Sequence, residues 1–548
     1  MKRVKQAKSV RSSSRRASAR SEAPAKGAAS SQRILRKAKP SHLDAIALEI
    51  HWKRLVSMVD EASTAFIRTS FSVLVREAND FAVVLTDAEG RSLAQSTMSI
   101  ASFIGSLPAT VKHFLDVFPA KTLKPGDVMI TNDPWMGTGH IHDVNIAMPI
   151  FHKGRIVAFA AVVSHMPDIG GRLRNAGVRE IFEEGLQIPR LKLIDGGKPN
   201  QTLFDMIAQN VRVPEMTLGD IWAQVAACKM LEERLQPLLR DTDLAALGAE
   251  IRRRSEAAMR KAIRAVPDGV YHSRLEHDGF EEPIVIDCTV RVKGDTIAID
   301  YTGSSEQVPR AVNVVPIYCF AYSAYAVKAL LSPEVPNNEG SFLPITTSAP
   351  LGSIFNPRYP AASGGRGMIG HMMVPAIVMA LSEALPDRAI AEGSSNSSIT
   401  VAGAHEGRPF SSICFMNAGQ GATQHRDGYS VLSFPSNLGN TPIEVFEQQA
   451  PLRVIERSIR RDSGGTGVHR GGGGLNFEIE VTGDAPMIAS MIMTRFRSAP
   501  MGLLGGGPGQ VGALELNGKP IDPADHWVLK KGDRVVMRTA GGGGFGPV

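Results

Sequence analysis

The chain carries two His-x-x-Asp pairs that lie 25 residues apart: His140 with Asp143, and His165 with Asp168. Small residues flank both pairs, so backbone could approach an ion closely. Neutral imidazole nitrogen and carboxylate oxygen are ligands of catalytic divalent metals, which keep one position for water. The residue chemistry therefore predicts a metal site. A structural network of hydrogen-bonded Asx and histidine turns is the alternative.

By type and spacing, His140, Asp143 and His165 are the candidate ligands. Asp80 precedes a predicted strand and is a candidate fourth ligand, although such a residue alone more often caps a strand. Two nitrogens and one oxygen favour zinc or manganese, or iron, over magnesium and calcium. Such an ion could lower the pKa of its bound water toward about 7, or polarise a carbonyl group. Covalent catalysis is disfavoured because the chain has no Gly-x-Ser-x-Gly elbow and no nucleophilic cysteine context.

Four further residues are expected to support the site without binding the metal. Asp168 is expected to orient His165, because metal-bound histidines usually donate their second ring N–H to a nearby acceptor. The side chain of His142 is expected to point away from the ion or to contact substrate. Asn132 and Asp133 are assigned to the same supporting group.

Both pairs are predicted to stand at the ends of neighbouring strands. The apolar run 128–131 predicts a buried strand that leads into the first pair. Residues 153–155, Lys-Gly-Arg, predict a hairpin turn between two apolar runs, and the second run, residues 156–163, leads to His165. Because hairpin-connected strands are neighbours in a sheet, the two pairs of side chains are expected to meet.

The rest of the chain mixes helical and strand-like patterns. The predicted helices cover residues 41–66, 220–259, 315–331 and 368–385, and the predicted strand hairpins cover residues 81–91 and 284–301. In residues 451–548, short strands alternate with glycine clusters at 464–474, 505–509 and 541–546. We interpret these clusters as tight β turns, because no GxxxxGK[ST] phosphate-binding loop occurs in the chain.

These patterns predict an α+β protein: a mixed α/β subunit of several subdomains with a β-rich, glycine-rich C-terminal region. With 548 residues, more than one domain is expected. We divide the chain into a disordered basic tail, a mixed α/β subdomain with the metal motifs, a central α+β subdomain and a β-rich C-terminal subdomain, over residues 1–40, 41–265, 266–450 and 451–548.

The net charge of +7 is concentrated in the tail. Residues 1–40 hold 13 of the 61 Lys and Arg residues and one of the 54 Asp and Glu residues. The remainder is mildly acidic and offers no basic face for nucleic acid. The tail is rich in Lys, Arg, Ser and Ala, which predicts disorder. It is a solvated tail or the product of a wrongly assigned start codon. The alternative is an organellar transit peptide.

The composition also bounds the location of the protein. No apolar run reaches the roughly 18 residues that a membrane helix needs, and no signal-peptide core follows the N-terminus. The four cysteines are scattered without a Cys-x-x-Cys pair, which fits buried thiols in a reducing compartment. We therefore expect a cytoplasmic protein that does not associate with membranes.

The chain resembles the hydantoinase B / 5-oxoprolinase B family, which includes caprolactamase and the acetone and acetophenone carboxylase subunits. The resemblance spans residues 41–548. It rests on an ordered series of motifs: Asn132-Asp133-Pro134, Gly139-His140-Ile141-His142-Asp143, Asp168-Ile169-Gly170-Gly171, Glu184-Gly185-Leu186-Gln187-Ile188-Pro189, Asn210-Val211-Arg212, Asn440-Thr441-Pro442-Ile443-Glu444, Asp462-Ser463-Gly464-Gly465-Thr466-Gly467 and Gly541–Gly546.

The resemblance implies a two-part enzyme that hydrolyses cyclic amides or imides. A separate, hydantoinase A-like ATPase subunit would use ATP to phosphorylate the carbonyl oxygen of a small-molecule substrate. This B-type chain would then open the ring with metal-activated water, with His140, Asp143, His165 and Asp80 as the implied ligands. We therefore expect a hetero-oligomer with the A-type subunit, and no activity from the chain alone.

The chain also departs from the family pattern around the expected pocket. Gly137-Thr138-Gly139 replaces the usual Gly-Gly-Thr, His142 and Met166 replace a common proline and a common histidine, and residues 364–371 lack a common polar run. The substrate can therefore differ from hydantoin or 5-oxoproline. Two alternatives stay open: a subunit of an ATP-dependent ketone carboxylase, which bicarbonate dependence would reveal, and a non-catalytic scaffold or metal-storage subunit, against which the intact ligands argue.

Overall fold

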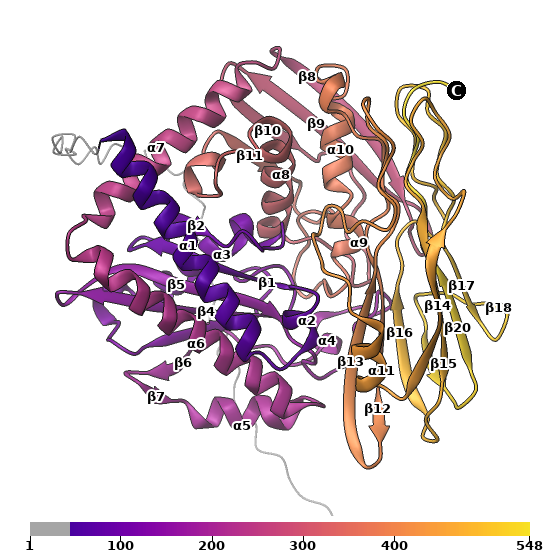
Figure 1. The fold of residues 1–548 in the computed structure, drawn as a ribbon, viewed down its shortest axis with the longest axis horizontal. Helices are drawn as coiled ribbons and strands as arrows, with labels where there is room; N and C mark the ends of the chain where they lie inside the picture. Colours follow the sequence, from indigo (N-terminus) through magenta and orange to yellow (C-terminus); the bar gives the residue numbers. More distant parts are fainter. Residues whose placement is uncertain (1–43) are drawn as a thin grey trace, which may run out of the picture. The chain divides into compact units, whose positions relative to one another are not determined.

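A seven-stranded antiparallel sheet carries both His-x-x-Asp pairs (Figure 1). The structure is a computed structural model that describes residues 44–548. The strand order is β2-β1-β5-β4-β3-β6-β7. The strands are β1 (Phe81–Asp87), β2 (Ser92–Gln95), β3 (Val128–Thr131), β4 (Asp143–His152), β5 (Arg155–His165), β6 (Leu191–Asp195) and β7 (Lys198–Pro199).

Helices cover both faces of this sheet: α1 (Ala45–Thr69) and α6 (Pro214–Leu239) on one face, and α3 (Phe103–Val117) on the other. Strand β1 shows the reason. Phe81 and Val83 belong to the apolar core under α1 and α6, whereas Ala82 and Val84 belong to the core on the α3 side. Because both faces are apolar, the strands β1, β4 and β5 are almost wholly buried.

The middle of the chain builds a second sheet, of order β11-β10-β9-β8. Its strands are β8 (Gly269–His277), β9 (Ile284–Lys293), β10 (Thr296–Asp300) and β11 (Ile345–Ser348). Helix α10 (Met373–Ala380) packs on β8 and β9, and α8 (Pro316–Leu331) packs against both α10 and α3. Helix α8 therefore joins the helical layer of this sheet to that of the first.

Two further sheets pack face to face in the C-terminal part (Figure 1). One has the order β13-β12-β16-β19, with β12 (Ser397–His405), β13 (Arg408–Met416), β16 (Met487–Ile492) and β19 (His526–Leu529). The other has the order β14-β15-β20-β17-β18, with β14 (Leu452–Arg460), β15 (Gly474–Val481), β17 (Ala513–Leu516), β18 (Lys519–Pro520) and β20 (Arg534–Arg538). Side chains such as Val401 and Phe477 fill the shared core.

The glycine clusters are not the tight turns that the sequence predicts. Their segments run beside one another and hydrogen-bond through the backbone, as in Gly542 N to Gly472 O (2.9 Å) and Gly465 N to Gly542 O (2.8 Å). A Cβ atom at Gly541 would lie 1.9 Å from Ser463 O. Glycine is therefore required because backbone packs directly on backbone.

Two predicted helices are also corrected. The helix expected over residues 220–259 is broken between α6 and α7 (Leu244–Ile263), where Asp243 caps the second helix. Leucines continue at helical spacing on both sides, which hides the break. The helix expected over 368–385 is α9 (Gly367–Gly370) followed by α10. The other helices of residues 44–548 are short: α2 (Val73–Arg76), α4 (Ile181–Glu184), α5 (Gln201–Asn210), α11 (Ile443–Gln449) and three 3₁₀ helices (Ala120–Thr122, Glu339–Phe342, Pro386–Arg388).

Several other expectations are confirmed. The mixed α/β class, the strand at residues 128–131, both strand hairpins, the turn at residues 153–155 and the helix at 315–331 are all present. All four cysteines are free and buried. The basic tail at residues 1–40 lies outside the described residues, and the subdomain boundaries stay predictions.

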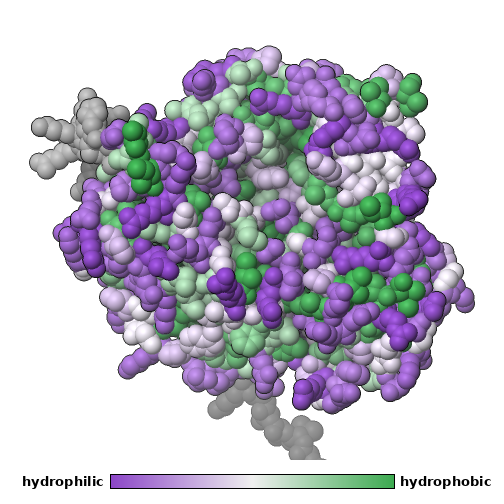
Figure 2. Space-filling model, in the orientation of Figure 1, coloured by the Kyte–Doolittle hydropathy of each residue, from purple (hydrophilic) through white to green (hydrophobic). Residues whose placement is uncertain are grey.

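The surface of the protein is mostly hydrophilic, as expected when the apolar side chains are buried in these cores. On the face in Figure 2, hydrophilic residues cover most of the surface and hydrophobic residues form separate patches. Within residues 44–548, no helix combines the length and apolar character that crossing a bilayer requires.

Candidate metal centre

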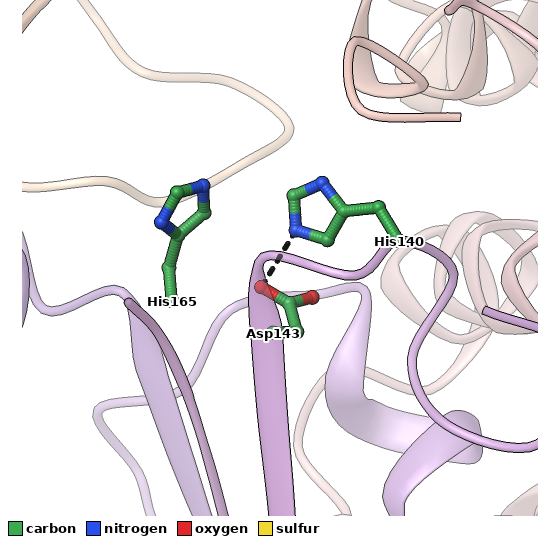
Figure 3. A group of neighbouring side chains, drawn as sticks. All are labelled: His140, Asp143 and His165. Carbon is green, nitrogen blue, oxygen red and sulfur yellow. Dashed lines mark ion pairs between the residues drawn. The ribbon is translucent and has the colours of Figure 1, made fainter. Parts of the chain in front are cut away.

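The hairpin of β4 and β5 brings the two His-x-x-Asp pairs together. Asp143 begins β4 and lies directly opposite His165, which ends β5. His140 stands in the turn just before β4, and its ring faces the other two side chains (Figure 3). The predicted meeting of the two segments is confirmed, but the first pair adjoins β5 through the start of β4 and not through the strand at residues 128–131, which is separated from β5 by β4.

Three ligand atoms converge in the interior of the protein. One atom each from His140, Asp143 and His165 lies within 4.8 Å of the others, and all three residues are buried. Nε2 of His140 is 2.7 Å from Oδ1 of Asp143. The side chains are only 1 to 5% exposed, so bulk water does not solvate these atoms.

The hydrogen bonds of the two rings fix which nitrogen carries the proton. Nδ1 of His140 contacts Gly364 O at 3.1 Å, and Nδ1 of His165 contacts Met166 O at 2.9 Å. Carbonyl oxygens only accept, so both Nδ1 atoms donate and both Nε2 atoms carry a lone pair. Burial, above all, lowers the pKa of His140 and of His165 well below the usual value, which keeps the rings neutral.

These lone pairs have no donor to meet. Neither Nε2 atom has a hydrogen-bond partner among the described residues, and Nε2 of His140 faces a carboxylate oxygen at 2.7 Å. Two acceptors at that distance repel each other unless a proton or a metal cation lies between them, and the lowered pKa of His140 disfavours the proton. The donor set of two imidazole nitrogens and one carboxylate oxygen therefore fits a divalent ion such as zinc or manganese.

The second oxygen of Asp143 is held from the opposite side. Oδ2 accepts from the guanidinium of Arg366 at 2.7 Å and from Oγ1 of Thr138 at 3.1 Å. The Arg366 guanidinium also lies over the ring of Tyr318, 4.3 Å from its centroid. These contacts fix the carboxylate so that Oδ1 faces the two histidines.

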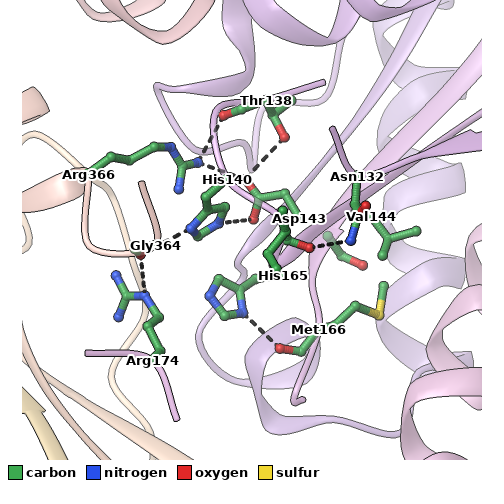
Figure 4. Close-up of polar contacts among 12 residues, drawn as sticks. Asn132, Thr138, His140, Asp143, Val144, His165, Met166, Arg174, Gly364 and Arg366 are labelled. Atoms are coloured by element: carbon green, nitrogen blue, oxygen red, sulfur yellow. Dashed lines mark hydrogen bonds and ion pairs between the residues drawn. The ribbon is translucent and has the colours of Figure 1, made fainter. Parts of the chain in front are cut away.

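The peptide of Gly364 is a second anchor for the site (Figure 4). Its oxygen accepts from Nδ1 of His140 and, at 2.9 Å, from Nε of Arg174. Its N–H donates to Oε1 of Glu184 at 2.5 Å. Burial raises the pKa of Glu184 to about 7. Burial also lowers the pKa of Arg174, to about 10, so its guanidinium stays charged at neutral pH.

Two other residues predicted for the site, Asp80 and His142, lie close to the three candidate ligands. Asp80 lines the same cavity, and burial followed by the charge of Asp143 raises its pKa to about 7. It is outside the convergent group of three, so its role as a fourth ligand stays a prediction. The ring of His142 lies 5.1 Å from that of His140 and 5.4 Å from that of His165. Its ligand atoms are also outside the group.

The expectation that Asp168 orients His165 is wrong. Asp168 binds Arg212 through Nη1 at 2.7 Å and through the backbone N–H at 2.5 Å. Nδ1 of His165 is already bonded to Met166 O. Each group has therefore found a different partner, and Asp168 anchors its own loop instead.

Asn132 and Asp133 support the fold of the ligand loop, and their side chains make no hydrogen bond with those of the three candidate ligands. The Asn132 amide donates to Ile141 O at 2.7 Å and accepts from Ile188 N at 2.6 Å. Asp133 Oδ1 accepts from Trp135 N at 2.8 Å, which closes a turn. Asn132 thus holds the peptide between Ile141 and His142, next to His140 in the ligand loop.

The convergent group opens on a cavity of about 60 Å³. Sequence reasoning placed residues 364–371 around the pocket but assigned no role to most of its polar lining: Arg174, Tyr318, Tyr322, Arg366, His371, Asn396 and Ser398. Apart from Arg174, which follows His165 by nine residues, these residues come from segments far from the two pairs, so no local spacing links them to the ligands. Arg366 offered one signal, because it is a lone charge among glycines at residues 364–367.

The fold and this site define a mixed α/β protein with a buried cluster of two histidines and an aspartate at a strand hairpin. A family model described as hydantoinase B/oxoprolinase matches residues 44–548, and the chain belongs to that family.

Relatives at the sequence level cover nearly the whole chain. An uncharacterized protein of Methanocaldococcus jannaschii is 30% identical over 519 residues, which are 92% of this chain and 91% of the relative. The 5-oxoprolinase of Dictyostelium discoideum is 27% identical over 526 residues, which are 92% of this chain but 40% of that longer protein.

Two solved structures share the fold. The ATP-dependent caprolactamase of Pseudomonas jessenii has a TM-score of 0.86 and 26% identity, with 92% of each chain covered. A nucleotide-free acetone carboxylase structure has a TM-score of 0.82 and 19% identity, with 92% of this chain and 76% of that chain covered. At that identity, the second likeness shows the fold alone.

Proposed function

We propose that this chain is the metal-binding B-type subunit of an ATP-dependent enzyme that opens a cyclic amide or imide. The observation that carries the proposal is the convergence of Nε2 of His140, Oδ1 of Asp143 and Nε2 of His165 in a buried place without a donor. The family description and the likeness to a caprolactamase support the substrate class.

These three atoms would hold a zinc or manganese ion. Such an ion, when bound, supplies a Lewis acid that can polarise a carbonyl oxygen or acidify a water. The chain itself supplies the orientation: Arg366 and Thr138 fix Asp143, and Gly364 fixes the ring of His140. Burial keeps both imidazoles neutral, so no proton has to leave before an ion binds.

Activation of the substrate is assigned to a partner. An amide carbon resists attack by water, whereas O-phosphorylation creates a leaving group and a better electrophile. The chain has no GxxxxGK[ST] loop. It also aligns with only 40% of the longer 5-oxoprolinase, which leaves room there for a further catalytic part. We propose that an A-type ATPase subunit performs the phosphorylation within a hetero-oligomer.

Ketone carboxylation is the second candidate. The likeness to acetone carboxylase shows a shared fold at 19% identity, so it does not select that reaction. The two reactions differ in their need for bicarbonate and in their products, which makes them separable in one assay.

The test uses the full chain, coexpressed and copurified with the A-type subunit. ATP-dependent turnover of hydantoin, 5-oxoproline, a lactam and acetone is measured with and without bicarbonate, together with the metal content of the complex. Ring opening without bicarbonate is the expected result. Turnover of acetone alone, dependent on bicarbonate, would replace the proposal with the carboxylase. ATP-dependent ring opening by the single chain would contradict the division of labour.

A further inference from the structure

The two arginines beside the candidate metal ligands differ in whether a carboxylate pairs with their guanidinium group. Arg366 is paired with Asp143 at 2.7 Å and also donates to Thr138 O at 2.9 Å. Arg174 has no carboxylate within ion-pair distance among residues 44–548. Its nearest partners are a carbonyl and a hydroxyl: Gly364 O at 2.9 Å from Nε, and Ser398 Oγ at 3.4 Å from Nη1.

The outer edge of the Arg174 guanidinium is therefore available. Nη2 has no hydrogen-bond partner among the described residues, and the contact of Nη1 is long. Arginine offers its two Nη atoms as a planar fork that matches two oxygens of a carboxylate or phosphate. Because Nε is fixed by Gly364, the direction of the fork is set before any ligand arrives (Figure 4).

The surroundings of Arg174 also favour a negative ligand. Arg174 lines the cavity onto which His140, Asp143 and His165 open. The hydroxyl of Tyr322, a fully buried residue of the same lining, makes no hydrogen bond of normal geometry. Asp143 is already matched by Arg366. A divalent ion beside Arg174 would bring three positive charges, and Asp80 and Glu184 could offset at most two of them.

We propose that Arg174 forms an anion subsite beside the metal ligands, and that the substrate presents an oxyanion group, a phosphoryl or a carboxylate, to its fork. The proposal rests on the proposed function only for the identity of the substrate. A phosphoryl group would come from the activated carbonyl, and a carboxylate would belong to the substrate itself. The cavity of about 60 Å³ admits only a small group of this kind.

The experiment titrates the full chain with inorganic phosphate and, separately, with acetate by calorimetry. Both the metal-loaded and the metal-free chain are used, since phosphate also coordinates metals. Arg174→Gln is expected to weaken binding of the preferred anion about tenfold or more in both forms, because a charge-assisted fork is lost. Arg174→Lys, which keeps the charge, is expected to weaken it less. Preference for phosphate identifies the phosphoryl group, and preference for acetate identifies a substrate carboxylate.

Arg172→Gln is the matched control. Arg172 lies two residues away, and its exposed guanidinium pairs with Glu183 at 2.9 Å, so anion affinity is expected to change less than about twofold. Circular dichroism checks folding, and Arg174→Lys decides if the glutamine variant does not fold. The subsite is overturned if the wild-type chain binds neither anion, or if the folded Arg174 variants bind as the wild type does. Arginine-dependent binding by a chain that takes up no metal would support the subsite and refute the proposed function instead.

Discussion

Two buried polar clusters, each beside the end of a strand, differ in whether their hydrogen-bond acceptors have donors. Asp278 follows β8 and accepts from Phe496 N, Arg497 N and both N and Oγ of Ser498, at 2.5 to 2.9 Å. Where β4 begins and β5 ends, the Nε2 atoms of His140 and His165 have no hydrogen-bond donor among the described residues. Buried polar groups are almost always satisfied. Burial of polar groups alone therefore does not mark a functional site, whereas buried acceptors without a hydrogen-bond donor do.

Removing a ligand should give the largest effect. His140→Ala, Asp143→Ala and His165→Ala each delete one of three donors, and a three-ligand site does not retain its ion well without one. Turnover by the complex is expected to fall on the order of 10³-fold or more, with metal content lost and the fold kept. Elemental analysis and steady-state kinetics measure both. Full occupancy and normal turnover in the His140 and His165 variants would end the metal assignment.

Asp278→Ala should show the opposite pattern. It leaves three backbone N–H groups and a hydroxyl without their acceptor, at an expected cost of about 3 kcal/mol in the free energy of unfolding. Metal bound per folded chain should stay unchanged. Urea denaturation and elemental analysis of the same samples test this, with Asp278→Asn as the milder control. Metal loss from folded Asp278→Ala would show that the two clusters are coupled.

Thr138→Val tests the support behind Asp143. The substitution removes the hydroxyl that donates to Oδ2 at 3.1 Å but keeps the shape of the side chain. Metal affinity is expected to fall about 10-fold, at the lower end of the range for such outer contacts, because Arg366 still holds the carboxylate. Competition with a chelator of known affinity measures the change. An unchanged metal affinity would show that Arg366 alone is sufficient to orient the carboxylate of Asp143.

His142→Ala should have the smallest effect on the metal. Its ring packs beside the rings of His140 and His165, but its ligand atoms lie outside the convergent group. Metal content is expected to stay near that of the wild type, with a loss of turnover far smaller than for the ligand variants. A loss of the ion as complete as in His165→Ala would make His142 a ligand.

The sequence predicted the parts of the site that one hairpin brings together. His140, Asp143 and His165 fall on adjoining strand ends, so turn chemistry and strand periodicity were enough to join them. The charges that complete the site were missed because Arg174 lies in an irregular segment nine residues after His165, and because Arg366 reaches the site only through tertiary packing. The partner of Asp168 was missed for the same reason, since its carboxylate binds Arg212, 44 residues later.

The glycine clusters were misinterpreted for a different reason. A run of glycines permits a turn, and it equally permits backbone segments to lie in direct contact. Only the neighbouring segments decide between these, as the position of Ser463 O against Gly541 shows. Likewise, leucines at helical spacing continue across the end of α6, and only the cap at Asp243 marks the new helix.

The contact between His140 and Gly364 has a consequence for synthesis of the protein. The three ligands leave the ribosome within a short stretch, but the carbonyl that orients the ring of His140 follows 224 residues later. At 5 to 20 residues per second, that delay is on the order of 10 to 40 s. A nascent chain with all its ligands translated therefore still lacks an oriented imidazole. Under the proposed function, tight capture of a metal ion would therefore follow synthesis and folding of the central part.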